Sequence, residues 1–126
     1  MPVELNHTIV HCYDRDHTAA FYAELLAVAA PTEYGPFLVL ELDNGVSLDF
    51  LGGGDVQPQH YAFLVSDDEF EPIFRRIRDA GLDYWADPFH QRLGQVNDND
   101  GGRGLYWEDP NGHNLEIITR PYGSGG

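Results

Sequence analysis

A short pattern occurs twice in this chain, and it restricts the possible folds more than any other feature. Residues 44–51 read Asn-Gly-Val-Ser-Leu-Asp-Phe-Leu, and residues 111–118 read Asn-Gly-His-Asn-Leu-Glu-Ile-Ile, without a gap between the two patterns. Each copy starts with Asn-Gly, a turn signal of β-hairpins, and continues as a strand that carries a carboxylate at the same offset. Such an internal repeat predicts two copies of one structural unit.

Two further segments extend the repeat to the start of each half. Residues 5–10 read Leu-Asn-His-Thr-Ile-Val, and residues 58–63 read Pro-Gln-His-Tyr-Ala-Phe, so that His7 and His60 each begin a predicted strand. Each of these strands is followed by a predicted helix with an apolar stripe along one side. We therefore expect the order strand, helix, strands in both halves.

Polar residues at the helix starts and the alternation of apolar residues give the limits of the elements. Asp16 is a candidate N-cap for a helix that ends near residue 28, and Ser66 with Glu69 forms a capping box for the second helix. Residues 87–103 are rich in Gly, Asn and Asp, which predicts a long loop. Strands are predicted for residues 5–13, 37–42, 46–51, 60–65, 104–108 and 114–119.

Length and charge exclude several classes of protein. The chain has 126 residues, enough for one domain, and its formal net charge is -14, with 7 basic residues against 21 acidic ones. That charge repels nucleic acid and anionic membrane surfaces. The sequence has neither a signal-peptide pattern nor the roughly 20 consecutive apolar residues that span a bilayer, and its single Cys12 excludes an internal disulfide. We expect a cytoplasmic protein with a small-molecule partner.

The histidines and carboxylates at the repeated positions are predicted to share one kind of surface. Because side chains alternate along a strand, His7, His60, Asp49 and Glu116 all fall on the faces turned away from the helices. Four polar residues on the exposed side of half-buried strands would be the ordinary interpretation. Their recurrence in both halves, and the apolar neighbours of His60 and Glu116, favour a site for a divalent metal ion, which imidazole and carboxylate ligands suit.

The sequence resembles the vicinal-oxygen-chelate superfamily, which includes glyoxalase I, extradiol ring-cleaving dioxygenases, fosfomycin-modifying thiol transferases and bleomycin-binding proteins. The likeness extends from Leu5 to about Thr119. Its most specific part is residues 105–116, which read Leu-Tyr-Trp-Glu-Asp-Pro-Asn-Gly-His-Asn-Leu-Glu. Further parts are residues 5–7, 21–26 and 60–63.

The resemblance implies an α+β fold in which two βαβββ modules form a cup-shaped half-barrel around a metal site. On this basis residues 1–122 form a single domain, with module one at about 3–53 and module two at about 58–120. Residues 123–126, which read Gly-Ser-Gly-Gly, are expected to be a flexible tail.

The resemblance also assigns roles to individual residues. His7, His60 and Glu116 match the family's ligand positions and would hold one divalent metal ion, of Fe, Mn, Ni, Co or Zn. Asp49 stands where some members carry a fourth ligand; its shorter side chain favours contact through water or with substrate. Tyr106 matches a tyrosine of the dioxygenases and fosfomycin enzymes, and either it donates to a metal-bound substrate oxygen or it is a core aromatic with a satisfied hydroxyl.

Departures from the family patterns guide the choice of activity. Extradiol enzymes carry an acid-base histidine in the strand region occupied here by residues 46–49, which contain none, although His11 or His90 could supply a proton from elsewhere. Fosfomycin enzymes have a threonine where this chain has Ile9, and they bind a phosphonate through basic residues that this acidic chain lacks. The first observation argues against ring cleavage, and the second argues against fosfomycin modification.

Glyoxalase-like lyase or isomerase chemistry is the expected activity, with catalytic roles for Tyr106, Asp49 and Glu116, because the two carboxylates could divide the tasks of base and metal ligand. The alternatives are an extradiol-type ring-cleavage dioxygenase and a non-catalytic antibiotic-binding resistance protein. A homodimer is expected because half-barrels leave sheet edges to cover. Whether the modules pair within one chain or across a dimer stays open. His17 and His113 are predicted to be exposed.

Overall fold

The structure, a computed structural model, describes residues 2–125. The chain divides into two compact units, unit 1 (Met1–Gln57) and unit 2 (Pro58–Gly126). The predicted domain start at residue 1 and the last residue of the predicted tail lie outside the described residues. Within residues 2–125, no helix has the length and apolar character needed to cross a membrane.

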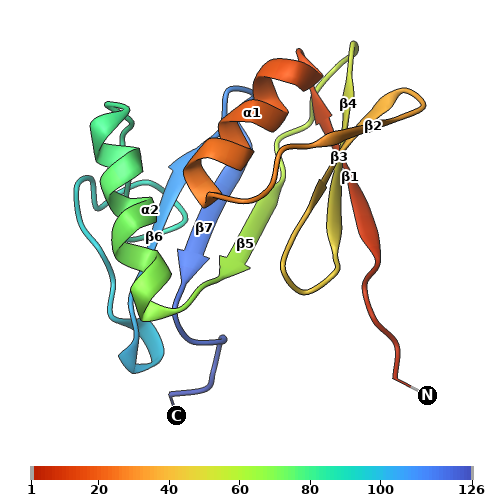
Figure 1. The fold of residues 1–126 in the computed structure, drawn as a ribbon. Coiled ribbons are helices and arrows are strands. Elements are labelled where there is room, and N and C mark those ends of the chain that lie inside the picture. The colour runs from red at the N-terminus through yellow and green to blue at the C-terminus, as the bar shows by residue number, and fades with distance from the viewer. Residues whose placement is uncertain (1, 126) are drawn as a thin grey trace. The chain divides into compact units, whose positions relative to one another are not determined.

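Unit 1 has the βαβββ order that the family resemblance implies, in agreement with the order strand, helix, strands predicted from the repeat. Its sheet runs in the order β1-β4-β3-β2, with β1 parallel to β4 and the other neighbours antiparallel, and α1 contacts β1, β3 and β4 (Figure 1). The elements are β1 (His7–Cys12), α1 (Arg15–Leu26), β2 (Thr32–Tyr34), β3 (Phe37–Glu41) and β4 (Ser47–Gly52).

Two details of unit 1 differ from the sequence-based expectation. The N-cap of α1 is Asp14 rather than Asp16, because the Asp14 carboxylate accepts the backbone N–H groups of Asp16 and His17 at 3.1 Å. The short strand β2 was not predicted; all three of its residues are exposed, so it lacks the apolar alternation that marks a strand. The core beneath α1 consists of Val10, Cys12, Ala19, Tyr22, Leu40 and Phe50.

Unit 2 repeats this order with one strand fewer. Its sheet runs in the order β5-β7-β6, again with the first strand parallel to the last one of the unit. In place of a fourth strand, Trp85 makes isolated bridges to Leu93 and Tyr106, in a segment that Pro88 and Gly94 interrupt. The elements are β5 (His60–Leu64), α2 (Asp67–Asp79), the 3-10 turn η1 (Asn99–Gly101), β6 (Gly104–Glu108) and β7 (Asn114–Ile118).

The helix α2 begins at the predicted capping box. The Ser66 hydroxyl accepts the Glu69 backbone N–H, and the Glu69 carboxylate accepts the Ser66 backbone N–H at 2.9 Å. Phe70, Ile73 and Ile77 form the buried side of the helix. The guanidinium of Arg103, next to the start of β6, lies 4.4 Å from the Phe70 ring centroid and links the helix to the sheet.

The registers of the two parallel strand pairs match each other. In unit 1, His7 faces Ser47 and Ile9 faces Asp49. In unit 2, His60 faces Asn114 and Ala62 faces Glu116. The repeated histidine and the repeated carboxylate therefore occupy equivalent places in both sheets, as the sequence repeat predicts. Each of the two α+β units thus has one histidine on its first strand and one carboxylate on the neighbouring parallel strand.

Candidate metal centre

Glu116 is the most deeply buried acidic side chain of the candidate site. It lies on β7, and 0% of its surface is exposed. Its neighbours Leu115 and Ile117, which point to the other face of the sheet, are also fully buried, so both faces of β7 are covered here. Its Oε1 atom is 3.0 Å from the His60 Nε2 atom. Its Oε2 atom is also buried and accepts no hydrogen bond from the described residues. A carboxylate in such a place needs a cationic partner, because burial of an unpaired charge is costly.

The orientation of His60 follows from its second ring nitrogen. His60 Nδ1 lies 2.9 Å from the carbonyl oxygen of Asn114 on the neighbouring strand β7. A carbonyl oxygen can only accept, so Nδ1 carries a proton and donates it. The Nε2 atom then faces the Glu116 carboxylate with either a second proton or a lone pair. Either a proton or a metal ion between Nε2 and Oε1 would satisfy both groups.

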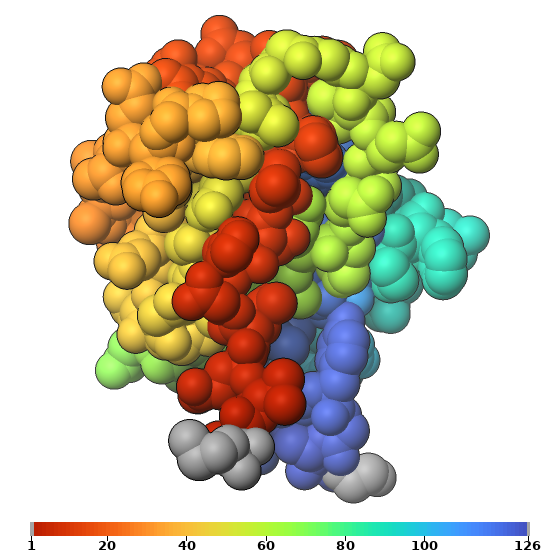
Figure 2. Space-filling model, turned by 90° about the vertical axis from the view of Figure 1, so that its right-hand side faces the viewer, coloured from red at the N-terminus to blue at the C-terminus, as the bar shows by residue number. Residues whose placement is uncertain are grey.

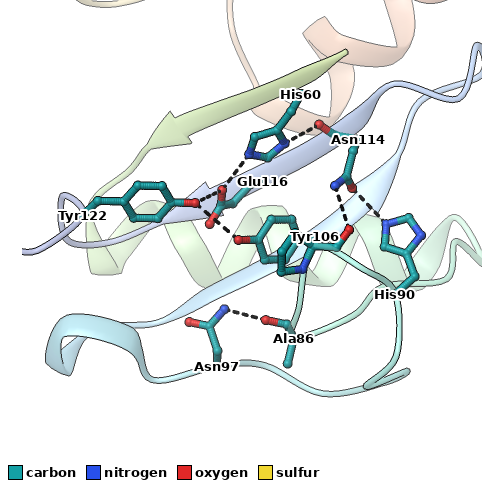
Figure 3. A network of polar contacts seen from close by, with 9 residues as sticks. His60, Ala86, His90, Asn97, Tyr106, Asn114, Glu116 and Tyr122 are labelled. Atoms are coloured by element: carbon teal, nitrogen blue, oxygen red, sulfur yellow. Dashed lines mark hydrogen bonds and ion pairs between the residues drawn. The ribbon is translucent and has the colours of Figure 1, made fainter. Parts of the chain in front are cut away.

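Two tyrosines complete the surroundings of Glu116 (Figure 3). Tyr106 pairs with Glu116 across β6 and β7, is 4% exposed, and stacks on the His60 ring with 5.8 Å between centroids. The Tyr122 hydroxyl donates to Glu116 Oε1 at 2.6 Å and lies 3.3 Å from the Tyr106 hydroxyl. Desolvation, followed by hydrogen bonding to Glu116, raises the pKa of Tyr122, and desolvation is also the first cause of the raised pKa of Tyr106. Both phenols are therefore protonated at neutral pH.

The long loop contributes a second layer of contacts behind His60. His90 Nε2 is 2.9 Å from Asn114 Oδ1, and the Asn114 amide donates to the carbonyl of Pro88 at 3.3 Å. The His90 ring stacks on Trp85 at 3.8 Å between centroids, with an interplanar angle of 5°. The backbone carbonyl that orients His60 is therefore part of a residue held by the loop.

His7 and Asp49 lie in unit 1. His7 is exposed on β1, and its Nδ1 atom is 2.7 Å from Asn6 Oδ1. Asp49 lies on β4 and accepts the Ser47 hydroxyl at 2.8 Å. In the space-filling view, the red N-terminal segment with β1 runs along the surface beside the yellow strands of the same sheet (Figure 2). Within neither unit do the described residues bring three His, Cys, Asp or Glu side chains together as a ligand set.

The remaining histidines give a mixed result. His17 is exposed on α1, as predicted. The prediction that His113 is exposed is wrong: it is 0% exposed, and its Nδ1 atom accepts the backbone N–H of Gln59 at 2.9 Å. The imidazole is buried because it satisfies a backbone donor just before β5. Tyr122 and Asn114 are not among the residues predicted from sequence, because their contacts depend on the turn of the chain after β7 and on a backbone carbonyl.

The residues of unit 2 fit a divalent metal ion. His60 Nε2 and Glu116 Oε1 are close enough for each to form a ligand bond of about 2.1 Å to one ion. The buried Oε2 atom, which accepts no hydrogen bond from the described residues, offers a further oxygen to the same ion. Among the described residues of unit 2, no third His, Cys, Asp or Glu joins this pair, and His7 of unit 1 stays a prediction from the repeat.

The chain is similar to known proteins in both sequence and structure. No protein-family model matches the chain. A glutathione transferase FosA of Serratia marcescens is 30% identical over 121 residues, which are 90% of this chain and 78% of that protein. The solved structure of the oxidase ChaP-H1 is 66% identical, with a TM-score of 0.95 over 97% of this chain and 99% of its own. That of the oxidase ChaP-H2 is 62% identical, with a TM-score of 0.96 over 100% of both chains.

Proposed function

The chain belongs to the vicinal-oxygen-chelate superfamily, and on this premise we propose that it is a metal-dependent oxidase of a small organic molecule with adjacent oxygen atoms. The observation that carries the proposal is the His60 Nε2 atom facing a fully buried Glu116 carboxylate at 3.0 Å. The two similar solved structures that are named oxidases favour oxygen chemistry over the lyase or isomerase chemistry expected from the sequence.

We assign His7, His60 and Glu116 as the ligands of one divalent metal ion. Two histidines and one carboxylate are the ligand set of non-haem iron oxygenases, so iron is the proposed metal among Fe, Mn, Ni, Co and Zn. When bound, such a metal supplies a Lewis acid and open positions for substrate and oxygen. His60 would approach it through Nε2, because Nδ1 is engaged by the Asn114 carbonyl.

Tyr106 and Asp49 are the proposed groups that handle protons. The Tyr106 phenol is protonated at neutral pH, as tyrosines ordinarily are, so it can donate a hydrogen bond to a substrate oxygen; desolvation raises its pKa further. Asp49 is half-buried beside Ser47 and can accept a proton or a hydrogen bond. Glu116 cannot accept a substrate proton while its carboxylate binds the metal, so its proposed catalytic role is to neutralise positive charge at the metal.

A glyoxalase-like lyase or isomerase is the second candidate. The observation in its favour is that Asp49 occupies the same register position in unit 1 as Glu116 does in unit 2. Two carboxylates at equivalent positions could serve as base and ligand. In either case we propose a homodimer, since β1 and β2 in one sheet and β5 and β6 in the other are edge strands. We also propose a cytoplasmic location, which the single Cys12 suits. Drug binding without turnover is the remaining alternative.

Oxygen consumption separates these candidates. The purified protein loaded with Fe²⁺ is given catechols in air, and a hemithioacetal of an α-ketoaldehyde in the absence of oxygen. We expect oxygen uptake that depends on substrate and is abolished in Glu116→Gln, whereas Glu24→Gln, an exposed control on α1, keeps it. Anaerobic turnover of the hemithioacetal without any oxygen uptake would instead establish the lyase. Tight binding of a cationic antibiotic with neither activity would overturn both enzymatic proposals.

A further inference from the structure

Tyr122 contacts the candidate metal ligand Glu116 from outside the sheet. It follows β7, in the C-terminal segment that lies on the surface in Figure 2, and its side chain approaches the carboxylate from the side opposite His60 in Figure 3. Its hydroxyl is 2.6 Å from Glu116 Oε1. Tyr122 is nevertheless 63% exposed, so burial of its ring does not explain its position.

The proton order among the three side chains can be deduced. A carboxylate only accepts, so Tyr122 uses its single hydroxyl proton for Glu116. The 3.3 Å contact between the two hydroxyls must then be donated by Tyr106. Hydrogen bonds to an ionised acceptor are short and about twice as strong as neutral ones, and the Tyr122 bond to Glu116 is of this type. The two phenols thus form a directed chain that ends on the carboxylate.

The segment after Tyr122 is held by a second carboxylate. The backbone N–H groups of Gly123 and Gly125 donate to the two oxygens of Asp100, each at 3.2 Å. Asp100 belongs to η1 and has a φ of 57°, a conformation that Asn and Asp tolerate best among residues with a side chain. This anchor fixes the chain immediately beyond Tyr122 and thereby sets where its ring lies.

We propose that Tyr122 is a positioning residue of the metal centre, which orients Glu116 for the metal and is itself positioned by Asp100 through the C-terminal segment. Tyr122 holds Oε1 on the side away from His60, so that Oε1 faces His60 Nε2, and the buried Oε2 stays available to an ion bound between the two residues. This inference rests on the metal site of the proposed function. Hydrogen-bonding partners of metal ligands contribute about 10- to 100-fold to metal affinity.

The test measures the dissociation constant of Co²⁺ for the full-length apoprotein by competition with a chromophoric chelator. Tyr122→Phe removes the hydroxyl and leaves the ring, and we expect it to weaken Co²⁺ binding about 10-fold. Tyr34→Phe alters an exposed tyrosine of β2 and is the matched control, which should leave the dissociation constant unchanged. Circular dichroism at the assay temperature should show both apoproteins folded, although Tyr122→Phe should melt at a lower temperature than the parent, because it loses a hydrogen bond to the buried Glu116 carboxylate.

The role of Asp100 is tested in the same assay. Asp100→Asn tolerates the same backbone conformation and replaces one acceptor oxygen by an amide, so it should weaken Co²⁺ binding in the parent chain. In the Tyr122→Phe background it should have no further effect, because Asp100 acts only through the phenol. Asp98→Asn, an exposed neighbour, is the control.

The outcomes distinguish this inference from the function on which it rests. If the parent protein binds no Co²⁺, both are overturned. Binding by the parent with an equal or smaller dissociation constant for Tyr122→Phe would overturn the positioning role alone. Additive effects of Asp100→Asn and Tyr122→Phe would show that the anchor does not act through Tyr122, which overturns that part of the proposal.

Discussion

At the scale of single residues, the backbone around Glu116 determines what the site can do. The carbonyl of Asn114 fixes the ring of His60, and the register between β5 and β7 places that ring beside the carboxylate. A buried carboxylate whose second oxygen accepts no hydrogen bond from the described residues needs a neutralising partner, which a proton or a metal ion can supply. The candidate site is therefore a consequence of strand register and not of an isolated sequence motif.

Tyr106 gives a prediction at this scale. If its phenol donates to a substrate oxygen, Tyr106→Phe lowers the rate of oxygen consumption by the Fe²⁺-loaded enzyme by about 100-fold or more. The free energy of unfolding should fall by about 1 kcal/mol, since the substitution removes the hydrogen bond between the Tyr106 and Tyr122 hydroxyls. Steady-state rates and urea unfolding measure the two effects. The exposed Tyr13→Phe is the control, and an unchanged rate would mean that Tyr106 is a core aromatic.

The sequence permits prediction of the contact between His60 and Glu116 but not of the contacts that support it. His60 and Glu116 meet as expected, because strand alternation and the internal repeat are visible in the sequence. Tyr122 could not be predicted, since its place depends on the chain turning back after β7 and on the anchor at Asp100. His113 was misjudged because its burial satisfies the backbone of Gln59, which no pattern of side chains reveals.

At the scale of elements, the helix α2 illustrates how a local signal sets a boundary. The capping box of Ser66 and Glu69 could be identified from four residues, and the helix starts there. The start of α1 was placed two residues late, because Asp14 and Asp16 are both acceptable caps in sequence. The fourth strand expected in unit 2 is reduced to bridges at Trp85, where Pro88 and the glycines after it prevent a continuous ladder.

The capping box yields a prediction about stability and pH. Backbone and side-chain hydrogen bonds from Ser66 lower the pKa of Glu69 below its ordinary value of 4.5. A lowered folded-state pKa adds stability above pH 4.5, and this contribution disappears as the pH falls through the lowered value. At pH 7, Ser66→Ala should reduce the free energy of unfolding by about 1 kcal/mol.

Urea unfolding of both proteins between pH 3 and pH 7 measures this effect, with pH values chosen on either side of the sequence pI of about 4.4 to keep the protein in solution. The difference between Ser66→Ala and the parent should shrink below pH 4.5. A difference that stays constant over the whole range would show that the Glu69 charge plays no part in the cap.

At the scale of the whole molecule, the chain is two related α+β units, each with a histidine and a carboxylate on paired parallel strands. The repeat in the sequence predicts the two units and their equivalent histidine and carboxylate positions, because hairpin signals and strand alternation recur in both halves, whereas the parallel pairing of the two strands comes from the structure. The reaction could not be predicted in the same way, since glyoxalases, oxidases and drug-binding proteins of this superfamily share the fold. Similarity to the two oxidases is what favours oxygen chemistry.

The metal content of the full-length protein tests the central claim most directly. Elemental analysis after purification without added metal, and again after loading with Fe²⁺ and gel filtration, should give one equivalent per chain. His7→Ala in unit 1, and His60→Ala and Glu116→Gln in unit 2, should each lose it, while the exposed His17→Ala retains it. A metal-free parent protein after loading, or one equivalent retained by all three ligand variants, would contradict the assignment of His7, His60 and Glu116 as the ligands.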